Sequence, residues 1–181
     1  TVVQDAELVT RLRAAGAIIM GSTNLSEWAN IRSGKSTSGW SAVGGLTANP
    51  WNYKHSAGGS SSGSGAAVAA GLIPFAVGTE TDGSIICPAS LNGVVGIKPT
   101  VGSVSVVGVV PVSSSQDVPG PIARSVEDAA MLLEVLSGQS GLVDLCHNDE
   151  PLRIGIVRSW VSGHEGANQL FEASLEKLSD A

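Results

Sequence analysis

Cysteine and histidine are scarce in this sequence. Its 181 residues include two cysteines, Cys87 and Cys146, and three histidines. The cysteines do not form a CxxC motif, and with so few histidines the sequence signals neither a zinc site nor a disulfide framework. We therefore expect no metal and no cofactor, and a reducing compartment is favoured.

Positive charge is also in short supply. Lys and Arg number 10 against 16 Asp and Glu, which gives a formal net charge of −6, and no run of basic residues occurs. A basic patch is the usual electrostatic signature of proteins that bind nucleic acids or anionic membranes. Neither partner is expected.

No hydrophobic run reaches the length of about 18 residues that a membrane span needs. Residues 1–16 have the pattern of a charged amphipathic helix, because Leu8, Val9 and Leu12 recur at helical spacing among charged residues. A secretory signal would instead begin with a basic region followed by an apolar core. The expected location is cytoplasmic.

Aromatic residues make up only 4% of the chain, although 43% of it is hydrophobic. The core must therefore consist mainly of Ala, Val, Leu and Ile, a blend that suits helices packed on a buried sheet. The length is that of one ordinary domain. These features favour a single α/β domain.

Periodicity and turn residues predict helices and strands that alternate along the chain. Helical spacing and capping patterns predict helices over residues 5–15, 64–71, 85–91, 125–136 and 167–178, and a short helix capped by Asn24. Apolar or β-branched runs predict strands over residues 17–20, 75–79, 94–97, 104–110 and 152–157. Residues 138–151 have the composition of a surface linker. The alternation favours an open α/β layered sheet.

Two loops rich in glycine and serine carry the strongest functional signal. Residues 58–64 read Gly-Gly-Ser-Ser-Ser-Gly-Ser, and residues 78–84 read Gly-Thr-Glu-Thr-Asp-Gly-Ser. A loop of small residues that enters a helix leaves backbone N–H groups unpaired, and the helix dipole favours negative charge above them. One such cluster is typical of a linker or a tight turn, but two together indicate a site.

Serines in such loops can act as nucleophiles if a base removes their proton. Amide hydrolysis also needs donors for the oxyanion of the tetrahedral intermediate. The base need not be histidine, because a lysine held neutral by its surroundings can act through a second hydroxyl that relays the proton. Two adjacent loops of this kind would supply both the hydroxyls and the donors.

The two loops lie within a longer series of motifs that resembles the amidase signature. The motifs are Ala57–Ser64, Ala66–Gly71, Val77–Ser84, Pro88-Ala-Ser90 and Gly96-Ile-Lys-Pro-Thr100. Residues 12–28 and Ser115–Pro121 resemble the segments that flank this signature, so the resemblance covers residues 1–140. It implies an amidase-signature fold, in which a mixed open sheet is flanked by helices on both faces. It also implies hydrolysis of a small-molecule carboxylic amide to an acid plus ammonia or an amine.

The resemblance also assigns catalytic roles to two serines of this chain. The family's nucleophile falls on Ser84, which would form the acyl-enzyme. The relay serine, whose preceding peptide bond is cis in the family, falls on Ser60, at the family's spacing from Ser84. Ser61 would lie beside Ser60 in the site.

The oxyanion donors implied by the resemblance are backbone N–H groups in the second loop. They belong to Thr81, Asp82 and Gly83, together with Ser84 itself. The family usually has glycine at the position of Asp82. A carboxylate therefore enters the site at this point, although the backbone donor is kept.

One component of the family's triad has no counterpart in this sequence. The catalytic lysine of the family belongs to a Lys-Asp pattern farther upstream of the relay serine than residues 1–59 extend, and none of Lys35, Lys54, Lys98 and Lys177 fits it. The resemblance implies that residues 1–181 form a partial amidase domain, with its signature region at about 55–100, without the lysine-bearing and substrate-shaping parts. Weak or no turnover is expected, unless Lys35 or Lys54 replaces the base.

Other interpretations of the same residues stay open. Gly59-Ser-Ser-Ser-Gly63 fits the nucleophile elbow G-x-S-x-G of the α/β-hydrolases, with Ser61 as the nucleophile, provided that a strand precedes it. The later members of such a triad would be Asp117 or Asp128 and His147 or His164.

A catalytically dead amidase-like scaffold or binding subunit would also explain the missing lysine. Ala29–Ser36 comes within one residue of the P-loop pattern, which would indicate a nucleotide-binding module.

Overall fold

The computed structural model of the chain describes residues 4–148, 150, 152–161 and 163–180. The chain divides into two compact units, Thr1–Asn148 and Asp149–Ala181. Within the described ranges, no helix is both long and apolar enough to cross a membrane.

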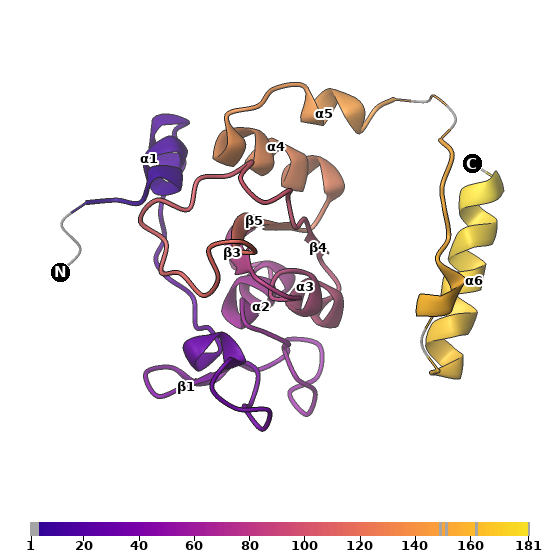
Figure 1. Ribbon diagram of the computed structural model, residues 1–181, viewed down its shortest axis with the longest axis horizontal. Helices are drawn as coiled ribbons and strands as arrows, with labels where there is room; N and C mark the ends of the chain where they lie inside the picture. The colour runs from indigo at the N-terminus through magenta and orange to yellow at the C-terminus, as the bar shows by residue number, and fades with distance from the viewer. Residues whose placement is uncertain (1–3, 149, 151, 162, 181) are drawn as a thin grey trace. The chain divides into compact units, whose positions relative to one another are not determined.

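A three-stranded sheet lies at the centre of the larger unit (Figure 1). Its strands are β3 (Phe75–Glu80), β4 (Val95–Gly96) and β5 (Val118–Ala123), in the order β3-β5-β4. Both pairs are antiparallel, and Glu80 lies opposite Val118 at one end of the β3–β5 ladder. The strands expected at 75–79 and 94–97 are confirmed with small changes of boundary.

The strand β5 was not predicted from the sequence, because two prolines normally argue against a central strand. The carbonyl of Pro121 accepts a hydrogen bond from Ile97 N at 3.1 Å, on the side of β4. Alternate residues of a strand bond to opposite neighbours, so the nitrogens of Pro119 and Pro121 also face that side. The N–H of Gly120, between them, faces β3 instead, so the prolines remove no donor from the β3–β5 ladder.

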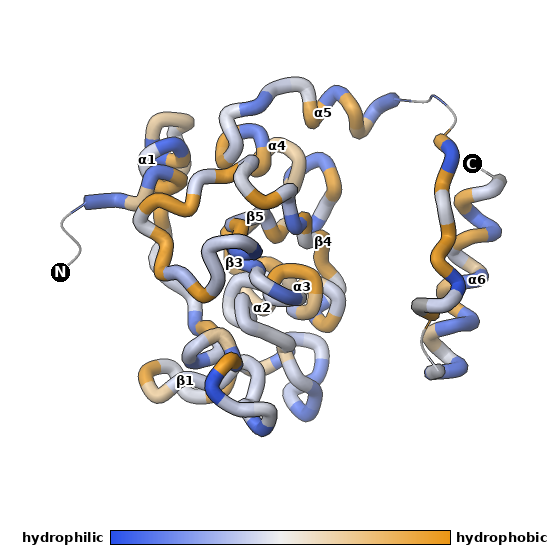
Figure 2. Tube along the Cα trace, in the orientation of Figure 1, coloured by the Kyte–Doolittle hydropathy of each residue, from blue (hydrophilic) through white to orange (hydrophobic). Residues whose placement is uncertain are grey.

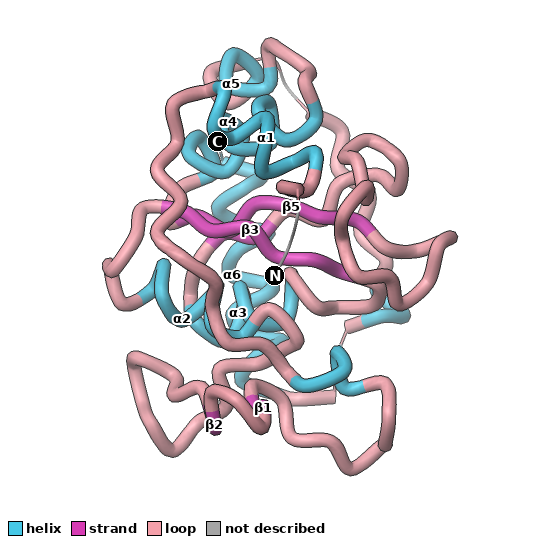
Figure 3. The backbone as a smooth tube through the Cα atoms, turned by 90° about the vertical axis from the view of Figure 1, so that its left-hand side faces the viewer, coloured by secondary structure: helices cyan, strands magenta, loops and turns pink. Residues whose placement is uncertain are grey.

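Helices cover both faces of the sheet. The helices α1 (Glu7–Ala14) and α4 (Val126–Ser137) lie on one side, and α2 (Ser62–Ala69) and α3 (Ile86–Asn92) lie on the other (Figure 3). One apolar cluster comprises Leu8, Leu12, Val104, Val118, Leu132 and Leu136. The second comprises Val68, Ile85 and Ile122. The α/β class and the helices on both faces are therefore confirmed.

The ends of α4 follow the local signals in the sequence. Ser125 caps α4, because its hydroxyl accepts a hydrogen bond from Asp128 N at 3.1 Å. Gly138 ends this helix with a φ of 74°, a left-handed conformation that glycine adopts without steric cost. The helices predicted over 5–15 and 125–136 are confirmed, as are those over 64–71 and 85–91 with shifted boundaries.

Two local predictions around these helices were wrong. Asn24 caps no helix, because its amide donates to the carbonyls of Gly39 and Gly45 and so ties together the hairpin of β1 (Trp40–Ser41) and β2 (Gly45–Leu46). The second wrong prediction is that residues 138–151 form a surface linker throughout. They contain the short helix α5 (Leu142–Leu145), which forms because Glu134 Oε1 accepts hydrogen bonds from the N–H groups of Leu142 and Val143.

Three predicted strands are not strands in the structure. Residues 17–20, 104–110 and 152–157 form turns, bends or segments without regular secondary structure, and no strand among the described residues pairs with them. Residues 17–20 line an apolar groove of about 680 Å³ together with the β3 residues Phe75 and Val77. An apolar run alone cannot reveal whether a neighbouring strand will supply the hydrogen bonds that a sheet requires.

The smaller unit consists of an extended segment, a 3-10 turn at Arg158–Trp160 and the helix α6 (Glu165–Asp180). The helix predicted over 167–178 is confirmed. Figure 2 shows the hydrophobic stretch around residues 154–157, which lines a hollow with Phe171, Leu175 and Leu178 of α6. Arg158 forms an ion pair with Glu172.

Candidate active site

The first serine loop enters α2 through a cis peptide bond between Gly59 and Ser60, as the resemblance implied. The Ser60 carbonyl accepts a hydrogen bond from Ser26 N at 3.0 Å. A Cβ atom on Gly59 would lie 2.3 Å from Ser26 Oγ, so only glycine fits this close approach. Ser60 itself is only 7% exposed, and the loop is firmly held.

The start of α2 packs directly on the backbone of Asn24. Gly63 N donates to Asn24 O at 2.8 Å. A Cβ atom built on Gly63 would lie 2.6 Å from that same oxygen and 2.7 Å from Asn24 N. The serine loop and the segment before η1 (Glu27–Asn30) are therefore in contact through backbone atoms, which cannot rotate away.

We expect Gly63→Ala to lower the free energy of unfolding by about 1–3 kcal/mol, because an added methyl group in a filled space forces the backbone to shift. Alanine has a higher helix propensity than glycine, which alone would raise the free energy of unfolding by roughly 1 kcal/mol. A net decrease would therefore come from the clash with the Asn24 backbone. Urea unfolding measures the change. Gly34→Ala is the control, since a Cβ atom there meets nothing within 4 Å. Equal stability of Gly63→Ala and wild type would contradict the packing.

Ser61 connects the first serine loop to the second. Its N–H donates to Ser84 O at 3.2 Å. Its hydroxyl donates to Thr79 O at 3.2 Å and accepts from Thr79 N at 3.1 Å. Gly78 leaves the room for this contact, because a Cβ atom at that position would lie 2.8 Å from Ser61 Oγ. The two loops therefore form one site.

The second loop turns between β3 and α3 and presents free backbone donors. Among the described residues, none accepts a hydrogen bond from the N–H groups of Thr81, Asp82, Gly83 or Ser84. Gly83 has a φ of 84°, a left-handed conformation that glycine favours. The turn leads into α3, whose N-terminal dipole favours negative charge.

A buried carboxylate holds the end of this turn. Glu80 is only 5% exposed, and its Oε2 accepts hydrogen bonds from Ile85 N at 2.7 Å and Ile86 N at 2.9 Å. These N–H groups follow Ser84 directly. Glu80 therefore satisfies the first donors of α3 and leaves the N–H groups of the turn itself unpaired.

The turn is also held by a carboxylate from the segment before β5. The Thr81 hydroxyl donates to Asp117 Oδ1 at 2.5 Å. The other oxygen, Oδ2, accepts from Val112 N at 2.7 Å and Ser113 N at 2.9 Å. Partial burial raises the pKa of the Asp117 carboxyl, but these three hydrogen bonds outweigh it and hold the pKa below its usual value.

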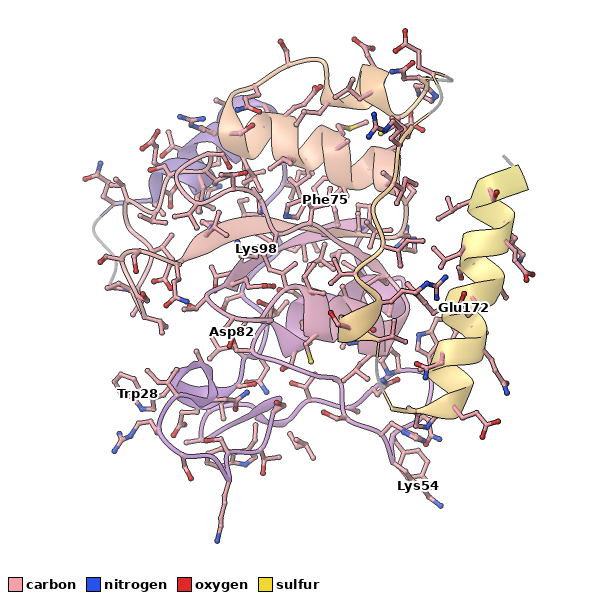
Figure 4. The ribbon with its side chains drawn as sticks, turned by 45° about the vertical axis from the view of Figure 1, so that its right-hand side comes forward. Trp28, Lys54, Phe75, Asp82, Lys98 and Glu172 are labelled. Atoms are coloured by element: carbon pink, nitrogen blue, oxygen red, sulfur yellow. The ribbon has the colours of Figure 1, made fainter. Side chains whose placement is uncertain are left out.

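The structure brings the three serines expected from the sequence to one place, but it shows no direct hydrogen bond between the two proposed catalytic hydroxyls. Ser60, Ser61 and the turn that carries Ser84 are neighbours through the Ser61–Ser84 backbone hydrogen bond. Within the described part of the chain, no hydrogen bond joins the hydroxyls of Ser60 and Ser84. The side chain of Asp82 is exposed beside the turn (Figure 4).

The lysines of the larger unit make no hydrogen bond to these serines among the residues described. Lys35 and Lys54 are exposed. The Lys54 ammonium lies 6.0 Å from the centre of the Tyr53 ring, and in Figure 4 it extends outward, away from Asp82. Lys98 Nζ donates to the Pro99 carbonyl at 3.4 Å. None of these three lysines is placed to accept a proton from Ser60.

The structure does not support the two alternative motifs. A nucleophile elbow needs a strand directly before Gly59, but residues 52–57 form turns and a single bridge residue. The imidazole of His147 lies 3.7 Å from Glu127, and both side chains are largely exposed. A P-loop needs a strand before it and a helix after it, whereas Trp28, Ala29 and Asn30 form a left-handed turn with positive φ.

Sequence reasoning missed the supporting residues of the site. Ser26 N donates to the first loop, and the Asp117 carboxylate accepts from the second. Glu80, which belongs to the second loop, accepts from the first N–H groups of α3. Glu80 could have been noticed as a carboxylate just before a predicted helix, the pattern of a helix-capping residue. Asp117 was considered only as a possible member of an α/β-hydrolase triad, and no local pattern predicts its hydrogen bond to Thr81, which is distant in sequence.

Comparison with known proteins shows which family the chain belongs to. The family model Amidase matches residues 2–181. The chain belongs to the amidase family. It is 53% identical over 135 residues to a putative amidase of Schizosaccharomyces pombe, an alignment that covers 75% of this chain and 23% of that protein. The amidase-signature fold predicted from the sequence is thereby shown.

Two further relatives extend this comparison. A probable amidase of Arabidopsis thaliana is 52% identical over 141 residues, which are 78% of this chain and 28% of that protein. The solved peptide amidase from Stenotrophomonas maltophilia is 58% identical with a TM-score of 0.74, covering 83% of this chain and 31% of that one. The chain thus spans less than a third of the length of each of these relatives.

Proposed function

We propose that this amidase hydrolyses the C–N bond of a carboxylic amide through an acyl-enzyme on Ser84. The observation that carries the proposal is the junction of the two serine loops. The Ser61–Ser84 backbone hydrogen bond joins a loop that presents hydroxyls to a turn whose N–H groups are bound by no acceptor in the described part of the chain. A nucleophile and an oxyanion hole within one site are what acyl transfer requires.

In the proposed reaction, Ser84 Oγ attacks the amide carbonyl carbon while its proton passes to the Ser60 hydroxyl, which at the same time gives its own proton to the base beyond it. The carbonyl oxygen becomes an oxyanion, and the C–N bond breaks as the leaving nitrogen takes up the proton that the base returns through the Ser60 hydroxyl. Water then attacks the ester on Ser84 and releases the acid. The products are a carboxylic acid and ammonia or an amine.

The oxyanion would bind to the N–H groups of Thr81, Asp82, Gly83 and Ser84. No described residue accepts a hydrogen bond from these N–H groups, so a substrate oxygen can do so. Ser61 supports the site by fixing the turn to β3. The relay by Ser60 needs a base beyond it, and the proposal assigns that role to none of the lysines of this chain.

Peptide amides and simple carboxylic amides are the proposed substrates. The solved relative from Stenotrophomonas maltophilia is a peptide amidase, so a peptide with a C-terminal amide is the first compound to test.

No group of three or more His, Cys, Asp and Glu side chains within the described residues could hold a metal ion. The proposal uses only serine and backbone groups.

The test is an assay of the complete natural polypeptide that contains this sequence. We expect a peptide amide or a small carboxylic amide to be converted to the acid, with one equivalent of ammonia released. Chromatography of the acid and an enzymatic ammonia assay measure both products. A folded polypeptide that binds amides without hydrolysing any of them would overturn the proposal in favour of a binding role.

A further inference from the structure

The carboxylate of Asp117 extends the β3–β5 pairing past its last backbone pair. The ladder ends where Glu80 lies opposite Val118. The next residues outward are Thr81 on the side of β3 and Asp117 on the side of β5. Their side chains meet in the 2.5 Å hydrogen bond from Thr81 Oγ1 to Asp117 Oδ1. A side-chain contact therefore replaces the ladder at the residue where the oxyanion turn begins.

Asp117 is itself held in place from the other side. Its second oxygen accepts the N–H groups of Val112 and Ser113, so the carboxylate cannot rotate without losing two hydrogen bonds. Hydrogen bonds to an ionised acceptor are shorter and stronger than neutral ones. The Thr81 side chain is thus bonded to a fixed, charged acceptor.

We propose that Asp117 is a positioning residue for the oxyanion hole, acting through the Thr81 hydroxyl. The inference rests on the proposed function, in which Thr81 N–H is one of the oxyanion donors. A donor contributes only when it lies about 2.7–3.1 Å from the position of the oxyanion. The bond to Asp117 restricts how the peptide of Thr81 can turn, while Glu80 restricts the other end of the same turn through Ile85 and Ile86.

The inference predicts a specific pattern of kinetic effects. Asp117→Asn and Thr81→Val should each lower kcat on the order of tenfold to a hundredfold, because a small displacement of catalytic groups has effects of this size. KM should change less than about threefold. Thr81→Ser keeps the hydroxyl and should retain most of the activity. The double variant Asp117→Asn/Thr81→Val should be no slower than the slower single variant, since both changes remove one interaction.

The experiment measures kcat and KM of these variants in the complete natural polypeptide, with circular dichroism and a melting temperature for each. Asp144→Asn is the matched control, because Asp144 is exposed on α5 and should keep wild-type kinetics. If the fold-loss of kcat in the double variant equalled the product of the two single fold-losses, the inference would be overturned. Loss of activity in Thr81→Ser equal to that in Thr81→Val would also overturn it.

The same measurements separate this inference from the function on which it rests. If wild type and Asp144→Asn hydrolyse the amide while Asp117→Asn matches them, the positioning role is wrong and the proposed function stands. If wild type and Asp144→Asn are both folded and inactive towards every amide, both proposals are wrong. A loss of activity in Asp117→Asn that only follows a loss of folded protein would also overturn the positioning role.

Discussion

Replacing Ser84 with alanine is expected to lower kcat for amide hydrolysis on the order of 10⁶-fold, as for other serine hydrolases that lose their nucleophile. The neighbouring hydroxyl of Ser61 is not placed to take over, since it is bonded to both backbone groups of Thr79. Steady-state kinetics on the complete polypeptide measure the loss, with circular dichroism as the check on folding.

The control for this variant lies on the helix that follows Ser84. Ser90 is exposed on α3, so Ser90→Ala should keep the wild-type rate. Residual turnover of Ser84→Ala within about tenfold of wild type would show that another group is the nucleophile. Because the hydrogen bond from Ser61 to Ser84 uses the Ser84 carbonyl, the alanine variant retains it and should remain folded.

Replacing Ser60 with alanine is expected to lower kcat roughly 10²–10⁴-fold, the usual contribution of a proton-transfer group. The backbone contact of Ser60 with Ser26 N does not depend on the side chain, so the fold should be preserved. The measurement is kcat at several pH values, together with the melting temperature. A variant that keeps kcat within about threefold of wild type would remove Ser60 from the mechanism.

Local signals in the sequence predicted the helices well because their information is carried by neighbouring residues. Ser125 with Asp128 marks the start of α4, and Gly138 marks its end. These residues act through hydrogen bonds and dihedral angles that need no distant partner. Strand predictions were less successful, as residues 17–20, which form no strand, and the unpredicted β5 show. Whether a run becomes a strand depends on a partner that lies elsewhere in the chain.

In the candidate site, too, the sequence predicted the residues that lie in local motifs but not those that depend on distant partners. The serines and the turn glycines lie in two short motifs, so the sequence alone could group Ser60, Ser61 and Ser84. The residues that hold the motifs could not be found so easily, because Ser26 and Asp117 reach them only through the tertiary fold. Asn24 shows the same limit, since its pattern suggested a helix cap and its amide instead bonds three groups in and around a hairpin.

The most direct test of the central claim is to identify the residue that forms the covalent adduct. The complete polypeptide would be treated with a fluorophosphonate, digested and analysed by mass spectrometry, alongside its Ser84→Ala and Ser61→Ala variants. We predict that the adduct lies on Ser84, persists in Ser61→Ala and is absent from Ser84→Ala. An adduct on Ser61 that survives in Ser84→Ala would contradict the assignment and favour the nucleophile elbow.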